Sequence, residues 1–206
     1  MEMKFVQPIR DVGTIVQIKN YLKVRSFRDY LMFSMGIHSG LRIADLLNLQ
    51  VWQVRNQMHV TFIASKTKNR KRKRRKEKKF IIHPDYRDDL EIYIRDMSDY
   101  AYLFASRQRK TKSGAVGEPI CRETAWRMLS KAAKHFGLEE IGCHSLRKTW
   151  GYHLITSTPP SQAAYVMALL MEAFGHETQE ETLRYLGLTQ DALDTMILRL
   201  SFTQTG

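Results

Sequence analysis

The sequence predicts a mainly α-helical (α+β) domain with a small three-stranded antiparallel sheet. Apolar residues recur at helical spacing along most of the 206-residue chain, whereas only three short segments have the composition of strands. Hydrophobic residues make up 43% of the sequence, which suffices for an ordinary core, and the length suits a single domain over residues 1–206. Three strands cannot organise a chain of this length, so we expect a helical core with the sheet at one side.

The first part of the chain predicts three helices and the sheet. Residues 11–23 carry an apolar stripe at helical spacing. Ser26, with Asp29 three residues later, resembles a capping box that opens a second helix, and Gly40 suits its end. The remaining elements are a short helix over 42–49, strands over 51–54 and 58–64 with a turn at Asn56 and Gln57, and a third strand over 80–82.

The rest of the chain predicts helices alone. Pro84 is suited to the first turn of a helix that we expect to reach residue 97. Gly137 is suited to closing the next helix. The later helices are expected over 122–136, 144–156, 161–171, 179–186 and 189–200.

Positive charge is concentrated in one segment. The formal net charge is +12, and residues 66–79 hold 11 basic residues and one acid, Glu77. Without this segment the chain would carry only +2. A polyanionic partner is the natural explanation, because each neutralised phosphate releases condensed counterions. The charge alone also allows a solvated loop or a nuclear-localisation-like tract, and we expect the segment to join the second and third strands.

The cysteines and the apolar runs exclude several classes of protein. Cys121 and Cys143 are too few for a disulfide framework and form no C-x-x-C pair, so the sequence predicts free thiols, a reducing compartment and no metal site. The amino terminus is too polar for a signal peptide. The longest apolar run, residues 163–171, is far too short for a membrane span. We therefore expect a cytoplasmic protein.

Two arginines occur in contexts that suit phosphate binding. Arg42 lies just inside a predicted helix start, where unpaired backbone N–H groups also favour an anion, and Asp45 is placed to orient its guanidinium. His144 and Arg147 are three residues apart, so on a helix they share a face and can reach one phosphate. Taken alone, Arg42 and Asp45 are better explained as a surface pair on a capped amphipathic helix, whereas His144 and Arg147 are equally compatible with two unrelated polar residues of a basic helix.

A tyrosine and a lysine complete the candidate residues. Tyr185 follows His176 by nine residues, and a tyrosine needs neighbouring cations to react as a nucleophile because its free pKa is about 10. Taken alone, Tyr185 is better explained as a packing residue. Lys66, at the end of the second predicted strand, could enter a groove and protonate a leaving oxygen, although only its position distinguishes it from its basic neighbours.

Together these features resemble the catalytic boxes of the tyrosine recombinase (phage integrase) family. The matching stretches are SGLRIADLLNL, the SKTK hairpin, HSLRKTWGYHL and FGHETQEETLRYLGL. They run from residue 40 to residue 188, nearly the whole of that family's catalytic domain. No single box is specific, but their order, with H-x-x-R and the His-to-Tyr spacing intact, is strongly so.

The resemblance implies a site-specific recombinase or integrase that cleaves and rejoins double-stranded DNA without metal, cofactor or ATP. Tyr185 would attack a phosphodiester, form a 3′-phosphotyrosyl link and free a 5′-hydroxyl. The other implied roles are phosphate binding by Arg42, Arg147 and His176, proton transfer at the tyrosine by His144, protonation of the 5′-oxygen by Lys66, and support from Asp45. The implied phosphate contacts of the basic segment are Lys68, Arg70, Lys71, Arg72, Lys73, Arg74 and Arg75.

The sequence departs from the family pattern in two places. Only a linker and a first helix, residues 1–25, precede the region of the first box, so we expect the amino-terminal core-binding domain to be absent. Lys148 follows the H-x-x-R box where many members have histidine. By resemblance we expect a monomer in isolation, a tetramer on DNA, a nucleoid location, and a terminal helix that docks in cis or in trans. The alternatives are a catalytically silent DNA-binding regulator, a type IB topoisomerase and an RNA-binding protein.

Overall fold

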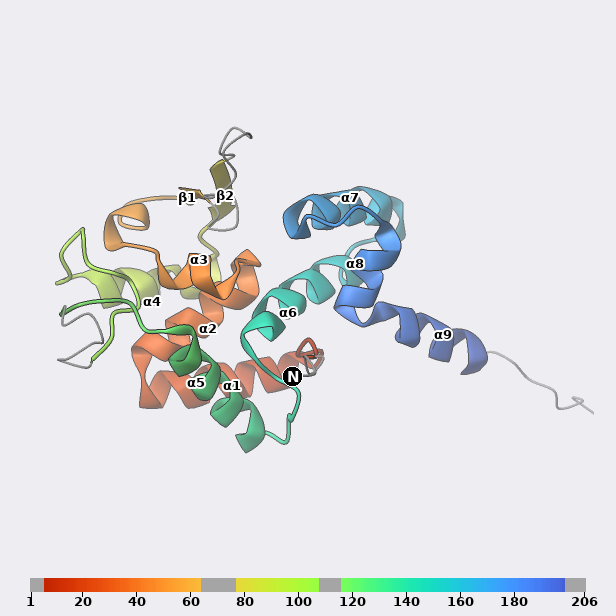
Figure 1. Cartoon of the computed structure of the whole chain (residues 1–206), viewed down its shortest axis with the longest axis horizontal. Coiled ribbons are helices and arrows are strands. Elements are labelled where there is room, and N and C mark those ends of the chain that lie inside the picture. Colours follow the sequence, from red (N-terminus) through yellow and green to blue (C-terminus); the bar gives the residue numbers. More distant parts are fainter. Residues whose placement is uncertain (1–5, 64–76, 108–115, 199–206) are drawn as a thin grey trace, which may run out of the picture. The chain divides into compact units, whose positions relative to one another are not determined.

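The computed structural model describes residues 6–63, 77–107 and 116–198 (Figure 1). These residues form two compact units, the first over Met1–Trp150 and the second over Gly151–Gly206. The described part is mainly helical with one small antiparallel sheet, which confirms the predicted fold class. No helix of the described ranges has the length and apolar character needed to cross a membrane.

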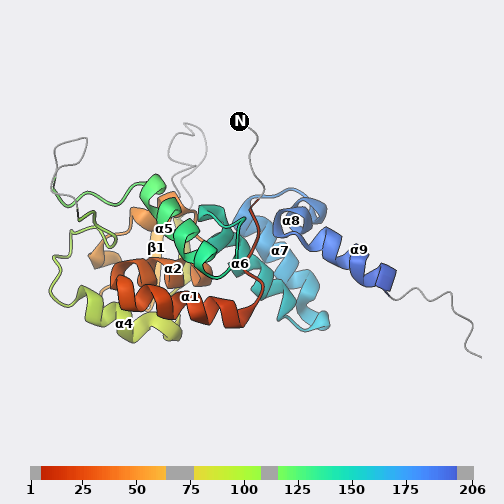
Figure 2. The same cartoon turned by 90° about the horizontal axis from the view of Figure 1, so that it is seen from below.

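The first unit is built around a buried helix. Its helices are α1 (Val12–Arg25), α2 (Phe27–Ser39), α3 (Ile43–Leu47), α4 (Pro84–Ile94), α5 (Arg122–His135) and the first part of α6 (Cys143–Thr156). Every residue over 30–37 of α2 is buried, and α2 packs against α1, α3 and α4. Figure 2 shows α2 beside α1 and α4. A helix that is apolar on all sides needs neighbours on all sides, so α2 forms the centre of this unit.

The helix ends follow the capping residues in the sequence. The Asp11 carboxylate accepts a hydrogen bond of 2.5 Å from the Thr14 amide and begins α1. Ser26 accepts a hydrogen bond of 3.4 Å from the Asp29 amide at the start of α2. The Asp29 carboxylate instead accepts from Arg28 at 2.9 Å, so only the Ser26 half of the predicted capping box is present among the described hydrogen bonds.

The sheet has two strands, not the three that the sequence predicted. Strands β1 (His59–Ile63) and β2 (Glu77–Ile81) pair antiparallel, with Val60 opposite Phe80. The segment 51–54 was wrongly predicted as a strand, because η1 (Val51–Gln53) is a 3-10 helix. Val51 and Val54 are both buried, and their spacing of three residues places them on one face of a helical turn rather than on one face of a strand.

Strand β2 begins within the basic segment. Residues 77–79 pair with β1, so they belong to the sheet and not to the connecting loop that we expected. Lys66 and the predicted phosphate contacts over 68–75 lie outside the described residues. The basic segment does connect the two strands of the hairpin, as predicted.

The second unit is a group of short helices after α6. It contains η3 (Pro160–Gln162), α7 (Ala163–Phe174), α8 (Gln179–Leu186) and α9 (Leu188–Leu198). Helix α8 packs against both α7 and α9. A side chain on Gly151 would approach the Phe174 ring to 2.6 Å, so this glycine allows α6 to pack closely against α7.

Candidate active site

The turn between α2 and α3 places Arg42. Gly40 ends α2 in the left-handed conformation, with φ of 61°, and Arg42 then serves as the N-cap residue of α3. A Cβ atom on Gly40 would lie 2.3 Å from the ring of Trp150, so only glycine fits between the turn and α6. The Gly-Leu-Arg sequence therefore brings Arg42 to the side of α6 that carries Arg147.

Arg147 is fixed by the same turn. Its Nη1 atom donates a hydrogen bond to the carbonyl oxygen of Gly40, and the side chain is only 7% exposed. Helix α6 also packs closely on α2, because a side chain on Gly36 would meet Leu146 at 2.6 Å. The guanidinium of Arg147 is thus oriented by the backbone that precedes Arg42, which joins the first and third predicted boxes in one place.

His144 lies on the first turn of α6 and is surrounded by positive charge. The first turn is anchored by Ser145, whose hydroxyl accepts a hydrogen bond of 3.0 Å from the Gly142 amide. His144 reaches solvent, yet partial burial lowers the pKa of its imidazole. Four cations lower that pKa further, in this order: Arg122, Arg147, Lys148 and Arg42. This cluster of cations favours a neutral histidine and an anionic ligand.

The second unit brings His176 and Tyr185 together. Gly175 ends α7 in the left-handed conformation, and His176 follows it at once. The rings of His176 and Tyr185 meet edge to face, with their centroids 5.2 Å apart, and Phe174 packs on both rings. The Nδ1 atom of His176 lies 3.0 Å from the Thr182 hydroxyl, which in turn donates to the Thr178 carbonyl at 3.3 Å. Nδ1 is therefore the ring atom that donates to Thr182.

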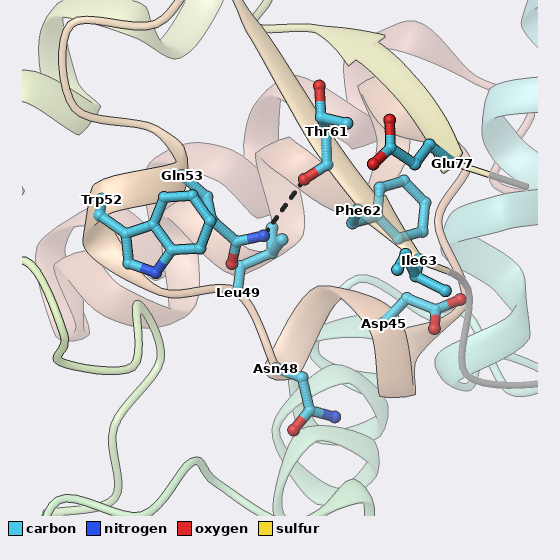
Figure 3. A pocket seen from close by; sticks show the side chains of 9 residues that line it. All are labelled: Asp45, Asn48, Leu49, Trp52, Gln53, Thr61, Phe62, Ile63 and Glu77. Carbon is cyan, nitrogen blue, oxygen red and sulfur yellow. Dashed lines mark hydrogen bonds between the residues drawn. The ribbon is translucent and has the colours of Figure 1, made fainter. Parts of the chain in front are cut away.

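Asp45 is buried and lies on the wall of a cleft (Figure 3). The cleft has a volume of about 520 Å³ and separates α3 and η1 from the hairpin of β1 and β2. Across it, the Gln53 side chain donates a hydrogen bond of 3.2 Å to the Thr61 carbonyl. Ile63, the last residue of β1, and Glu77, the first residue of β2, line the same cleft. The cleft therefore extends to the two strand ends that are joined by the segment containing Lys66.

Comparison with known proteins identifies the family. Residues 10–191 match the model of the phage integrase family. The chain is 40% identical over 189 residues to the probable integrase/recombinase YoeC of Bacillus subtilis (strain 168), and the match covers 92% of this chain and 93% of YoeC. The chain belongs to the phage integrase family.

Solved structures share the fold of this integrase. The crystal structure of XerA recombinase superposes with a TM-score of 0.65 at 18% identity, covering 95% of this chain and 65% of XerA. The XerH site-specific recombinase bound to a palindromic difH substrate superposes with a TM-score of 0.64 at 17% identity, covering 94% of this chain and 53% of XerH. The integrase thus spans less than two thirds of either chain.

Two members of the cation cluster, Arg122 and Lys148, were not singled out as site residues from the sequence. Arg122, at the start of α5, lines a cleft of about 370 Å³ together with His144. Lys148 is only 3% exposed, and burial lowers the pKa of its amine to about 8. Arg122 precedes His144 by more than twenty residues, so no local motif could have linked the two. The position of Lys148 directly after Arg147 was the only available signal.

Proposed function

We propose that this integrase is a site-specific DNA recombinase that breaks and rejoins DNA through a covalent link to Tyr185. The observation that carries the proposal is the solvent-accessible His144 among the cations of Arg42, Arg122 and Arg147. Like charges gathered around one histidine repel one another, and a phosphodiester would relieve that repulsion. The non-bridging oxygens would meet the two guanidinium groups of Arg42 and Arg147, whose planar donors suit phosphate.

Binding of the phosphate would also prepare His144 to accept a proton. In the unbound protein, burial and the surrounding cations keep the pKa of His144 low, so the imidazole is neutral. A bound phosphate adds negative charge beside the ring and raises its proton affinity. His144 would then take the hydroxyl proton of Tyr185 as the phenolate attacks phosphorus. The 5′-oxygen leaves as the 3′-phosphotyrosyl bond forms, and we assign its protonation to Lys66.

His176 would meet the phosphate through Nε2. Because Nδ1 donates to Thr182, the ring is fixed in one orientation beside Tyr185. A protonated Nε2 would donate to a non-bridging oxygen and stabilise the charge that develops in the transition state. Phe174 packs against both rings and limits their motion, which favours a fixed geometry for attack.

The partner is double-stranded DNA, and we propose that the basic segment over 66–79 contacts its phosphates. Exchange of strands needs two DNA sites, so further protomers would assemble on DNA, four in the complete synapse. The Tn1549 transposon integrase, which shares this fold with a TM-score of 0.58, was solved in complex with transposon right end DNA, and this supports DNA as the ligand. The organisation of residues 1–206 as a single catalytic domain stays a prediction.

A covalent-trapping assay tests the proposal. The protein is incubated in EDTA with supercoiled plasmid and nicked duplexes, the reaction is stopped with SDS, and DNA-linked protein is measured. We expect an adduct in the wild type that vanishes in Tyr185→Phe. The matched control is Tyr165→Phe, because Tyr165 is an exposed tyrosine of α7 in the same unit. Arg147→Lys should keep DNA binding and lose most cleavage, because lysine lacks the bidentate fork.

The other outcomes identify different functions. Tight DNA binding without an adduct on any DNA would indicate a catalytically silent regulator. An adduct with plasmid relaxation but no joining of two sites would indicate a topoisomerase. An adduct that persists in Tyr185→Phe would remove Tyr185 from the role of nucleophile.

A further inference from the structure

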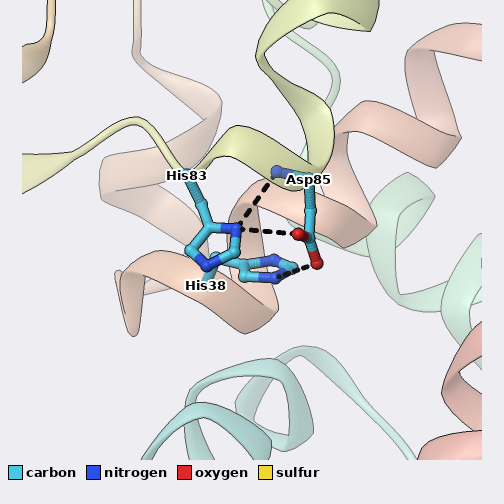
Figure 4. Close-up of side chains that lie close together, drawn as sticks. All are labelled: His38, His83 and Asp85. Atoms are coloured by element: carbon cyan, nitrogen blue, oxygen red, sulfur yellow. Dashed lines mark hydrogen bonds and ion pairs between the residues drawn. The ribbon is translucent and has the colours of Figure 1, made fainter.

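Three potential metal ligands meet on the surface of the first unit. His38 lies in the last turn of α2, His83 is the N-cap residue of α4, and Asp85 lies in the first turn of α4 (Figure 4). One ligand atom from each of the three residues lies within 4.8 Å of the others. His38 is mostly buried, with a side chain 18% exposed, whereas His83 and Asp85 are open to solvent at 42% and 52%. The cluster is thus preformed on one side and accessible on the other.

The hydrogen bonds fix which nitrogen of each ring carries a lone pair. Nδ1 of His38 lies 2.8 Å from the carbonyl oxygen of Ser34, which can only accept, so this nitrogen carries the proton. The lone pair of a neutral His38 is therefore on Nε2, which faces the Asp85 carboxylate at 3.3 Å. Nδ1 of His83 accepts the Asp85 amide at 3.2 Å and also faces the carboxylate at 3.3 Å.

Two ring lone pairs and a carboxylate thus lie close together, with Nε2 of His38 facing Oδ2 of Asp85 and Nδ1 of His83 facing Oδ1, and such a group can bind a cation. The two distances of 3.3 Å exceed those of charge-assisted N–H···O bonds, which are about 2.7–2.9 Å. Each equals the separation of about 3.3 Å between a nitrogen and an oxygen ligand at two corners of a tetrahedron with zinc bonds of about 2.0–2.1 Å, and a small rotation of the Asp85 carboxylate would offer one oxygen to both nitrogens. A metal ion therefore fits the spacing better than a shared proton.

We propose that His38, His83 and Asp85 form a Zn²⁺ site with water as the fourth ligand. The Ser34 carbonyl orients the His38 ring through its other nitrogen, as is usual for a metal-bound histidine. Zinc suits imidazole and carboxylate ligands. On binding, Nδ1 of His83 exchanges the Asp85 amide for the metal, at the expense of one hydrogen bond of the α4 N-terminus.

The position of the site gives zinc a structural role. The ion would join the end of α2 to the start of α4. It would thereby cross-link the two ends of the segment that contains α3, η1 and both strands. His38 precedes Arg42 by four residues, and β2 ends two residues before His83. Zinc would therefore stabilise the base of the hairpin that leads to Lys66. The site is separate from the proposed cleavage chemistry, so it stands or falls independently of the recombinase proposal.

A zinc titration of the whole chain tests the site. The protein is stripped with EDTA, transferred to chelator-free buffer and titrated with ZnCl₂ in competition with a chromophoric zinc chelator. Three variants each remove one ligand: His38→Gln, His83→Asn and Asp85→Asn. Asparagine at position 83 keeps a side chain that can cap α4. The control is His153→Gln, because His153 lies on α6 outside the cluster, and circular dichroism checks the fold of every variant.

We expect the wild type and His153→Gln to bind one equivalent of zinc. Each ligand variant should bind zinc at least about 100-fold more weakly, because even the loss of a residue that only contacts a metal ligand lowers metal affinity about 10- to 100-fold. Zinc at about 100 times its Kd should lower the unfolding constant of the wild type about 100-fold and leave the ligand variants nearly unchanged. X-ray absorption should find nitrogen and oxygen ligands without sulfur. A wild type that binds no zinc, or ligand variants with the affinity of the wild type, would overturn the site.

Discussion

Replacing Gly40 with alanine should unfold the first unit more easily and disable the proposed site. Gly40 combines a left-handed backbone, with φ of 61°, and a position where a Cβ atom would lie 2.3 Å from the Trp150 ring. The left-handed conformation costs a non-glycine residue about 1–2 kcal/mol. Overpacking against the large, partly buried Trp150 ring costs about 1–3 kcal/mol more. We therefore expect Gly40→Ala to lower the free energy of unfolding by about 2–5 kcal/mol.

Gly137→Ala is the matched control for that substitution. Gly137 also has a left-handed backbone, with φ of 74°, but a Cβ atom there would meet nothing within 4 Å. Gly137→Ala should lose only the conformational part, about 1–2 kcal/mol. Urea unfolding of both variants separates the two contributions. Equal losses would refute the close contact between the Gly40 turn and α6.

The same substitution should reduce cleavage beyond its effect on stability. Trp150 must shift to admit the new methyl group, and Arg147, three residues earlier on α6, donates to the Gly40 carbonyl. A misplacement of about 1 Å in a catalytic group costs on the order of 100-fold in rate. We expect the folded Gly40→Ala protein to form the tyrosyl adduct about 100-fold more slowly at an unchanged affinity for DNA. A normal rate would show that the turn does not orient Arg147.

Further predictions concern other contacts. Thr182→Val should slow adduct formation about fivefold through the loss of one hydrogen bond to His176, worth about 1 kcal/mol, whereas Thr182→Ser should restore it. When the cleavage rate at limiting DNA is measured against pH, its fall on the acid side should have a midpoint below pH 6.5, because the pKa of His144 is lowered. A midpoint above pH 6.5 would contradict the placing of His144 among cations. Burial lowers the pKa of Lys148 to about 8, below its unfolded value of 10.5, so the unfolded chain binds more protons between these values. Stability in urea should therefore rise from pH 8 toward pH 10, and Lys148→Met should abolish the rise. Alanine at positions 72–75 should weaken binding to all DNA sequences and flatten its salt dependence, and an unchanged slope would remove the segment from the interface.

Local signals predicted most of the helices. The bounds predicted for α8, 179–186, match the structure because Thr178 caps its start and Gly187 ends it in the left-handed conformation. The strand predicted over 51–54 was wrong because a four-residue segment with three apolar residues does not distinguish a strand from a helical turn. Two hydrogen bonds between Gln50 and Gln53 stabilise the helical turn: the Gln50 amide donates to the Gln53 side chain at 2.9 Å, and the Gln50 carbonyl accepts from the Gln53 amide at 3.1 Å.

The candidate site was predictable only where its residues occur in a recognisable order. The H-x-x-R spacing predicts that His144 and Arg147 share a face of α6, and the structure places both on that helix. The contact of Gly40 with Trp150, the nearness of Arg122 to His144 and the grouping of His38, His83 and Asp85 depend on tertiary packing between distant segments. His38 and His83 are too far apart in sequence to form a metal motif, so the sequence predicted no metal site.

The two halves of the proposed chemistry belong to different compact units. Arg42 and Arg147 are fixed by the Gly40 turn within the first unit, whereas Tyr185 is positioned by Phe174 and His176 within the second. Cations alone bind a phosphate without cutting it, and a tyrosine without cations stays protonated near neutral pH, because its free pKa is about 10. Loss of Tyr185 should therefore leave phosphate binding intact, whereas loss of both arginines should weaken binding and cleavage together. This asymmetry follows from where each group is anchored, and neither half can substitute for the other.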